Sequence, residues 1–523
     1  MRSRWVWILV GIALVLRLLL LTFHETVEID GVYYITMGKN FIQGNGLRDI
    51  EGNINTVFMP LYPIFTGVVS LIVSNGELAA RLISIIFGAL LILPVYGLAR
   101  RIYDQKVALI AAAITAVYPA LTYISSITYA DSLYLFLITS AMYTGYRALQ
   151  SGVLKEYIAT AVLYSLAYLT RPEGWLYILM TALYVLWHKR EQWKKAIKPA
   201  ATVLIVACLV VLPYLAFVYT QSGDLSLSSK GYVIYKFRAY QPFSEEYEKN
   251  IFGLNEAKDD ILLNPYKVRG SFVKEVIAQS DVFLLRYITN LVREIYIVIP
   301  KVFPFIIFSL FAFALRSWNK DEWKKESYLL MLVAYPILFY PLFWVEARYL
   351  LPILPIVILW AGKGIVQIAE RWKSIKISWM ITGIILVSLL GNIFANHLID
   401  SRFEKINPPV EHKQAGLWVK EQYMHPRIME RKPWVSFYGG GTFVNFPYVN
   451  SYDELIIYAC NNKVDLMVID ERYTAPLRPQ VAALLGYPNP TLYPEVHKVY
   501  EEQAYPPKKS IMIYQINCDK KLF

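Results

Sequence analysis

The sequence predicts an α-helical polytopic membrane protein with about eleven transmembrane helices, outer juxtamembrane helices and a small C-terminal α/β soluble domain. Apolar residues make up 56% of the 523 residues, whereas Asp, Glu, Lys and Arg make up only 18%. An ordinary soluble domain has about 25% of these charged residues, so this chain has too few to cover a soluble surface. The apolar residues also fall into blocks of about 20, the length that crosses a bilayer.

Composition excludes several other protein classes. A chain this apolar is not intrinsically disordered, and three cysteines exclude a disulfide scaffold or a Cys-rich metal site. The net charge of +12 points to either nucleic acid or a membrane. The positions of Lys and Arg along the chain decide between the two.

The first apolar block, residues 5–23, follows Arg2 and Arg4. No A-x-A-like cleavage site follows it, so we expect an uncleaved anchor helix rather than a signal peptide. The later blocks that predict spans are 82–99, 107–126, 132–148, 156–170, 173–187, 199–219, 287–315, 328–344, 349–368 and 377–396.

A shorter block, residues 57–74, either crosses the membrane or lies along its outer side. If it does not cross, about nineteen Lys and Arg residues fall in the short cytoplasmic segments and few fall outside, as the positive-inside rule requires. If it crosses, every later loop inverts and the basic clusters lie outside. We therefore expect an outer juxtamembrane or re-entrant helix that begins near Pro60 and Pro63.

This topology predicts the domain organisation. The N-terminus is cytoplasmic, residues 1–399 form the transmembrane catalytic domain, and residues 400–523 form an extracytoplasmic α/β domain. The outer segments 24–81, a first loop with juxtamembrane helices, and 221–286, a large and partly helical loop, belong to the membrane domain. Because the topology explains the positive charge, we expect no nucleic-acid partner.

The C-terminal region alternates apolar runs with a helical pattern, which predicts a small α/β domain. The expected elements are strands at 434–438, 465–470, 496–501 and 510–516, and a helix at 452–461. Gly439–Gly441 lack the spacing of a nucleotide-binding motif and favour a tight turn. Cys460 and Cys518 either form a disulfide or remain two buried thiols.

Several charged residues are expected at the outer ends of different spans. They are Glu28, Asp30, Asp131, Arg171, Glu173, Glu346 and Arg348. Ionisable residues at membrane depth are costly and are therefore candidates for function. Each also has a structural interpretation: Asp131 as a helix cap, Arg171 and Glu173 as a salt bridge at a turn, and Arg348 as a snorkelling anchor. Arg17, inside the first span, either snorkels or binds phosphate.

Carboxylates and arginines together suit a phosphate-linked substrate. A carboxylate can act as a general base on a hydroxyl or amine acceptor, and arginine binds phosphate through two parallel hydrogen bonds. The sequence contains no H-E-x-x-H, G-x-S-x-G or Walker A motif. No cofactor is required by these residues, and a divalent metal held by Glu28, Asp30 or Asp131 stays open.

The order of short motifs along the membrane region carries a family resemblance. These motifs are DGVYY (30–34), MPLYPIF (59–65), AARLIS (79–84), YADSLYLFL (129–137), LTRPEG (169–174) and ARYLLPILP (347–355). The chain resembles the GT-C superfamily of membrane glycosyltransferases, and within it the branch of protein O-mannosyltransferases and the bacterial aminoarabinose transferase. The resemblance covers about residues 1–400 and rests on the order of the motifs.

The resemblance implies an inverting enzyme that takes a sugar from a polyprenyl-phosphate carrier. It implies Asp30 as the base that activates the acceptor and Asp131 as the second acid of the site. It matches Tyr34 to the tyrosine that follows the first Asp and places Arg348 at the donor phosphate. We further expect donor-binding roles for Arg171, Glu346, Tyr62, Arg81 and Arg17. Phe58-Met59 stand where the aminoarabinose transferase has a Lys before its Pro-Pro-Leu-Tyr, which leaves the donor and the acceptor open.

Two other classes of function compete with this interpretation. A polytopic transporter or lipid flippase would share the span count, but transporters usually show internal repeats and binding residues near the midplane. A sensor would need a ligand for residues 400–523, and nothing in that segment indicates one. The expected partners are a polyprenyl-phosphate-linked sugar, membrane lipids and an acceptor that the sequence does not identify.

Overall fold

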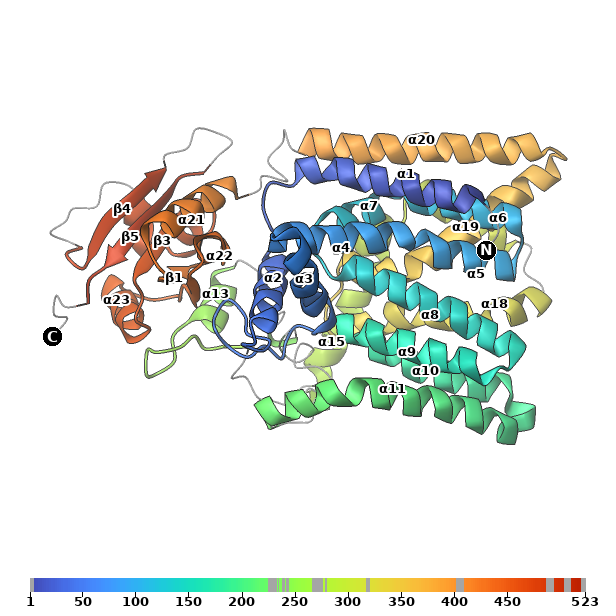
Figure 1. Cartoon of the computed structure of the whole chain (residues 1–523), viewed down its shortest axis with the longest axis horizontal. Coiled ribbons are helices and arrows are strands. Elements are labelled where there is room, and N and C mark those ends of the chain that lie inside the picture. The colour runs from blue at the N-terminus through green and yellow to red at the C-terminus, as the bar shows by residue number, and fades with distance from the viewer. Residues whose placement is uncertain are drawn as a thin grey trace.

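The computed structural model shows a helical bundle with an α/β unit at one end (Figure 1). The chain's N-terminus lies toward the end of the bundle that is farther from this unit. The structure describes residues 4–223, 233, 235–237, 240, 244–265, 276–277, 280–316, 320–400, 409–485, 493–502 and 509–518.

The bundle consists of helices of different lengths, most of them rich in apolar residues. In chain order they are α1 (Arg4–Leu20), α4 (Gly76–Leu90), α5 (Ile92–Ile102), α6 (Gln105–Val117), α7 (Pro119–Ser126), α8 (Asp131–Ser151), α9 (Leu154–Thr170), α10 (Gly174–His188), α11 (Trp193–Ser222), α15 (Ser280–Arg293), α16 (Ile299–Val302), α17 (Phe305–Leu315), α18 (Lys320–Phe339), α19 (Leu354–Arg371) and α20 (Ile375–Asp400). The outermost helices expose large apolar side chains, among them Leu19, Leu209 and Val387. A soluble protein would bury such faces, so they mark a multi-pass membrane protein.

The number of spans stays a prediction. Five helices in the described part of the chain are long and apolar enough to cross a membrane, and two bent pairs raise this to seven. The block at 287–315, expected as one span, is bent by 104° between Ser280–Val302 and Phe305–Leu315, so it is either a broken span or a re-entrant loop. Pro304 lies at this break, and proline cannot continue a helix.

Two short helices, α2 (Ile29–Ile42) and α3 (Leu61–Val73), run across the bundle at the end that bears the α/β unit (Figure 1). α3 begins directly after Pro60 and is shorter than a span, as expected for block 57–74. The two helices touch at Gly38 and Gly67, where a Cβ on Gly67 would lie 2.4 Å from the Gly38 carbonyl oxygen. Glycine therefore permits the close packing that holds α2 in place.

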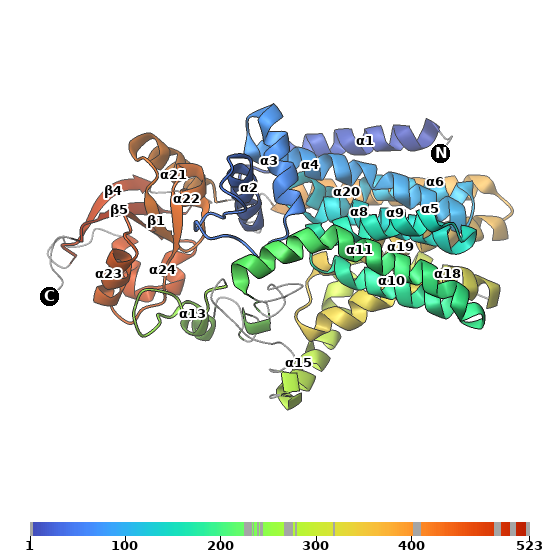
Figure 2. The same cartoon turned by 60° about the horizontal axis from the view of Figure 1, so that its bottom comes forward.

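The C-terminal unit is a five-stranded mixed sheet with helices on both faces (Figure 2). Its strands, in the order β2-β1-β3-β5-β4, are β2 (Thr442–Asn445), β1 (Arg427–Glu430), β3 (Leu466–Asp470), β5 (Ile511–Ile516) and β4 (Val496–Glu502). β1 is parallel to both neighbours, and β5 is antiparallel to both of its own. Leu466 and Val468 pack toward α21 (Val410–Gln422), and Met467 and Ile469 pack toward α23 (Tyr452–Asn461).

The sequence-based elements of this unit are confirmed except one. β3, β4, β5 and α23 lie where we expected them, but residues 434–438 form a helix, α22 (Trp434–Gly439), instead of a strand. The Glu430 carboxylate accepts hydrogen bonds from the backbone N–H groups of Val435 and Ser436, which satisfies the start of α22. Gly440, at φ 68°, ends it, so Gly439–Gly441 form the expected turn after a helix rather than after a strand.

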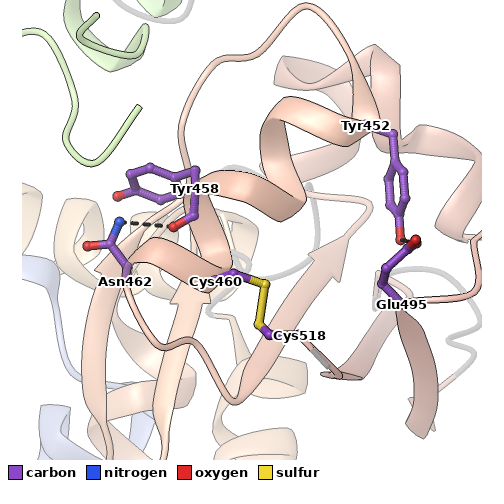
Figure 3. Close-up of a disulfide and its surroundings, with 6 residues drawn as sticks. All are labelled: Tyr452, Tyr458, Cys460, Asn462, Glu495 and Cys518. Atoms are coloured by element: carbon purple, nitrogen blue, oxygen red, sulfur yellow. Dashed lines mark hydrogen bonds between the residues drawn. A yellow bond between two sulfur atoms is a disulfide. The ribbon is translucent and has the colours of Figure 1, made fainter. Parts of the chain in front are cut away.

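A disulfide joins Cys460, in α23, to Cys518, directly after β5 (Figure 3). The two Cα atoms are 5.7 Å apart, an ordinary span for this bond. The disulfide settles the alternative that the sequence left open. Of the outer segment 221–286, the structure describes a helix, α13 (Glu245–Phe252), and the turn after it; much of the rest lies outside the described residues.

Candidate active site

Asp30 and Arg348 form an ion pair at the end of the bundle that carries the α/β unit. Asp30 lies in the first turn of α2, and Arg348 lies in η5 (Ala347–Ile353), directly before α19. The Arg348 guanidinium donates to the Asp30 carboxylate at 2.9 Å, and its Nε lies 3.3 Å from Glu346. Both side chains of the pair keep about a quarter of their surface exposed, 23% for Asp30 and 25% for Arg348. A substrate can therefore reach them.

A second, more buried pair joins Asp131 to Arg171. Asp131 opens α8, and Arg171 follows α9, where Pro172 ends the helix. The Arg171 guanidinium donates to Asp131 at 2.6 Å and contacts both oxygens of Glu173 at 3.2 and 3.3 Å. The expected salt bridge between Arg171 and Glu173 at the turn is present. Arg171 also pairs with Asp131, the residue expected as the second acid of the site.

The Tyr349 ring brings these two pairs together. The Arg171 guanidinium lies 5.6 Å from the centre of this ring, and the Arg348 guanidinium lies 5.5 Å from it. Both distances are in the range of cation–π contact. The outer-end residues that the sequence singled out on four separate segments therefore form one cluster.

Tyr34 lies within the field of the same four charges. Burial raises the pKa of its hydroxyl well above the ordinary value; Asp30 and Asp131 raise it further, and Arg171 and Arg348 oppose them. The hydroxyl thus stays protonated and can donate a hydrogen bond to a phosphate or sugar oxygen.

Glu28 turns away from this cluster. Its carboxylate accepts hydrogen bonds from the backbone N–H of Thr128 at 3.0 Å and from the Thr128 hydroxyl at 2.6 Å. Among the described residues, no three His, Cys, Asp or Glu side chains are placed to hold a metal ion. Asp30 and Asp131 each pair with an arginine, and a divalent metal held by Glu28, Asp30 or Asp131 stays a prediction. Metal dependence is a question for a chelator experiment.

Three residues expected in the donor site make structural contacts. The Tyr62 hydroxyl donates to the Ala80 carbonyl, and its ring packs edge-on against Tyr34. Arg81 donates to the carbonyls of His24 and Thr26. Arg17 is fully buried and donates to the Ser125 hydroxyl and to the Ala116 carbonyl, beside the break between α6 and α7. Arg17 therefore does not snorkel, and a donor-binding role for these three residues stays a prediction.

Arg293 and Trp344 also lie beside the cluster, although neither was predicted as a site residue from the sequence. The Arg293 guanidinium stacks on the Trp344 ring at 4.2 Å, and the Trp344 indole donates to Glu346. Glu346 in turn lies beside Arg348, so Arg293 is a further cation next to the cluster. The sequence contained a signal for this position, because Arg293 and Glu294 are two adjacent ionisable residues inside an expected span.

Comparison with known proteins decides what this architecture is. The family model of dolichyl-phosphate-mannose-protein mannosyltransferases matches residues 59–217. The solved structure of ArnT from Cupriavidus metallidurans bound to undecaprenyl phosphate superposes with a TM-score of 0.59 at 15% identity, over 98% of each chain. The chain has the fold of the GT-C membrane glycosyltransferases. No curated protein sequence matches it.

A second GT-C structure agrees with this assignment. The apo oligosaccharyltransferase of Archaeoglobus fulgidus superposes with a TM-score of 0.60 at 13% identity, over 90% of this chain and 70% of that one. The same enzyme, AglB, has been solved with an inhibitory peptide and a dolichol-phosphate. The GT-C resemblance that the sequence motifs predicted is thus confirmed at the level of fold.

Proposed function

We propose that this GT-C chain is an inverting glycosyltransferase that moves a sugar from a polyprenyl-phosphate donor to an acceptor hydroxyl at the outer membrane face. One observation carries the proposal: two carboxylate–arginine pairs meet at the Tyr349 ring at one end of the bundle. Such a cluster can supply a base and two phosphate-binding cations to a phosphate-linked substrate.

Each charged group has a role in the proposed displacement. Arg348 and Arg171 bind the donor phosphate, with Arg293 beside them. Asp30 accepts the proton of the acceptor hydroxyl while that oxygen attacks the anomeric carbon from the face opposite the phosphate. The bond from the anomeric carbon to the phosphate oxygen breaks, and the polyprenyl phosphate leaves with the electron pair. A single displacement inverts the configuration of the sugar.

The ion pair between Asp30 and Arg348 fits this sequence of events. A donor phosphate competes with Asp30 for the Arg348 guanidinium, because both are anions that arginine binds through two hydrogen bonds. Donor binding therefore frees the Asp30 carboxylate to act as a base. Asp131 keeps Arg171 in position, since its 2.6 Å bond lies in the protein interior.

The position of the charges argues against the transporter alternative. A transporter holds its substrate near the bilayer midplane, whereas this cluster lies at the ends of α2, α8, α9 and η5. The buried Lys363 is paired with Glu322 and Glu326, so it is not a free substrate-binding cation.

The proposal is tested with the purified full chain and a panel of radiolabelled polyprenyl-phosphate sugars, each with and without EDTA. Transfer from one donor, with the opposite anomeric configuration in the product, supports it. Transfer that EDTA abolishes would add a metal to the mechanism. No transfer from any donor by folded protein, with uptake of donor across proteoliposomes instead, would support the transporter.

A further inference from the structure

The C-terminal domain holds the backbone directly before Asp30. The Trp434 indole donates to the Val27 carbonyl at 2.7 Å, and the Tyr438 hydroxyl accepts from the Val27 N–H at 2.9 Å. We call this pair of bonds the Val27 clamp. Val27 is only 1% exposed, so both of its peptide groups depend on the clamp for hydrogen bonding.

The bundle holds the same short segment from the other side. Arg81 donates to the carbonyls of His24 and Thr26, and Thr128 donates twice to Glu28. The chain from residue 24 to residue 28 is therefore fixed residue by residue. α2 begins at Ile29, so this segment sets the place and direction of the helix turn that carries Asp30.

The clamp residues are themselves fixed inside the C-terminal domain. The Trp434 ring stacks on Tyr473 at 5.6 Å and meets the edge of His412 at 5.7 Å. Trp434 also belongs to the apolar core of the membrane bundle, with 5% exposure. The packed Trp434 ring therefore holds the Val27 backbone at a fixed place relative to the C-terminal domain.

A second outer segment is anchored on the same domain. Glu248, in α13, is fully buried and pairs with Arg431 at 2.7 Å and with Arg478 at 2.8 Å. The Tyr448 N–H adds a backbone bond to Phe252 at 2.7 Å. The domain therefore connects the first outer loop with the segment between α11 and α15.

We propose that the C-terminal domain positions the general base, and that Trp434 and Tyr438 are its positioning residues. The inference rests on the proposed role of Asp30. Neither side chain touches the Asp30–Arg348 pair, so both act through the Val27 backbone. A reacting group displaced by about 1 Å costs about 10²-fold in rate, so loss of the clamp lowers the chemical step rather than donor binding.

The test compares Trp434→Phe, Tyr438→Phe and the double variant with wild type. Each single variant keeps an aromatic side chain and removes one hydrogen-bonding group; Trp434→Phe also replaces the indole with a smaller ring. The matched control is Trp418→Phe, whose ring packs on Tyr423 and Tyr500 within the same domain. We expect the double variant to lose about 10- to 100-fold in kcat, with donor KM within about 2-fold, and the control to match wild type. A double variant with wild-type kcat overturns the inference, as does a change confined to KM.

Hydrogen exchange provides a readout that does not need activity. We expect the amides of residues 27–34 to exchange faster in the double variant, while α8 and β3 keep their protection. If the wild-type protein transfers no sugar, the proposed function fails and this exchange alone decides the inference. Unchanged protection of residues 27–34 then contradicts it. Tyr438→Phe removes a single oxygen and covers the case in which the tryptophan variant does not fold.

Discussion

The Arg348 guanidinium donates a 2.9 Å hydrogen bond to the carboxylate of Asp30, a residue 318 positions earlier in the chain. The fold brings the two together from the first turn of α2 and from η5. This contact joins the proposed base to the proposed phosphate ligand. A phosphate that binds Arg348 must therefore compete with the Asp30 carboxylate for the same guanidinium.

Replacement of Arg348 is expected to weaken donor binding. Lysine keeps the positive charge but loses the planar pair of donors, so Arg348→Lys should raise donor KM roughly 10-fold, and Arg348→Gln should raise it further. Initial rates over a range of donor concentrations measure this. Arg190→Lys, at the start of η2 and beyond the opposite end of α10 from Arg171, is the control. A donor KM equal to wild type in both Arg348 variants would remove Arg348 from the donor site.

Replacement of Arg171 is expected to destabilise the protein. Asp131 is 4% exposed, and Arg171→Gln would leave its charge buried without its partner, at a cost of about 3–5 kcal/mol. Arg171→Gln should therefore lower the Tm in detergent strongly, and Arg171→Gln combined with Asp131→Asn should recover part of the loss. A double variant whose Tm falls by the sum of the two single losses would show that the pair is not coupled.

The sequence predicted which charged residues gather at one end of the bundle better than it predicted the irregular parts of the fold. Charges at span ends are few, so Asp30, Asp131, Arg171 and Arg348 stood out, and the positive-inside rule placed them on one side. The sequence could not show which carboxylate each arginine meets, because those contacts join segments far apart in the chain.

The errors have local physical causes. Residues 434–438 have the aromatic and β-branched composition of a strand, but the Glu430 carboxylate and Gly440 satisfy the two ends of a helix there. β1 and β2 have four residues each, too few for an alternating pattern to be recognised. The bend of 104° after α16 follows from Pro304. The block at 287–315 was recognised by its overall apolar composition, and a single proline hardly changes that composition.

The membrane orientation is tested with single exposed cysteines in a Cys208→Ser background. Cys208 is the free cysteine, and Cys460 and Cys518 are bonded to each other. Met424→Cys, on the C-terminal domain, should react with a membrane-impermeant maleimide on intact cells. Trp372→Cys, between α19 and α20, should react only after permeabilisation. The opposite pattern would invert the predicted topology.

The stability of the C-terminal domain should fall in alkaline solution. Burial alone would lower the pKa of His412, but Asp470 and Glu411, within 3.8 and 3.4 Å, outweigh it and raise the pKa to about 9. A His pKa raised above the unfolded value of 6.5 gives stability that is complete below that pH and is lost as the pH rises through about 9. Glu430, whose pKa burial raises to about 7, and Arg472, paired with Glu411, are the nearby charged groups.

Thermal unfolding between pH 6.5 and 9.5 measures this loss. Wild-type Tm should decrease over that range, and His412→Gln should have a lower Tm at pH 6.5 with a flatter profile. His497→Gln, at an exposed position on β4, should keep the wild-type slope. A wild-type slope in His412→Gln would assign the pH dependence to another group.

The most direct measurement is the transfer rate of purified Asp30→Asn, compared with wild type and with Asp453→Asn, an exposed aspartate on α23. The substrate is the radiolabelled polyprenyl-phosphate sugar that wild type accepts. With Asp30 as the base, Asp30→Asn keeps the wild-type Tm and loses transfer by at least about 10²-fold, while Asp453→Asn keeps it. Wild-type transfer by folded Asp30→Asn would contradict the assignment of Asp30 as the general base.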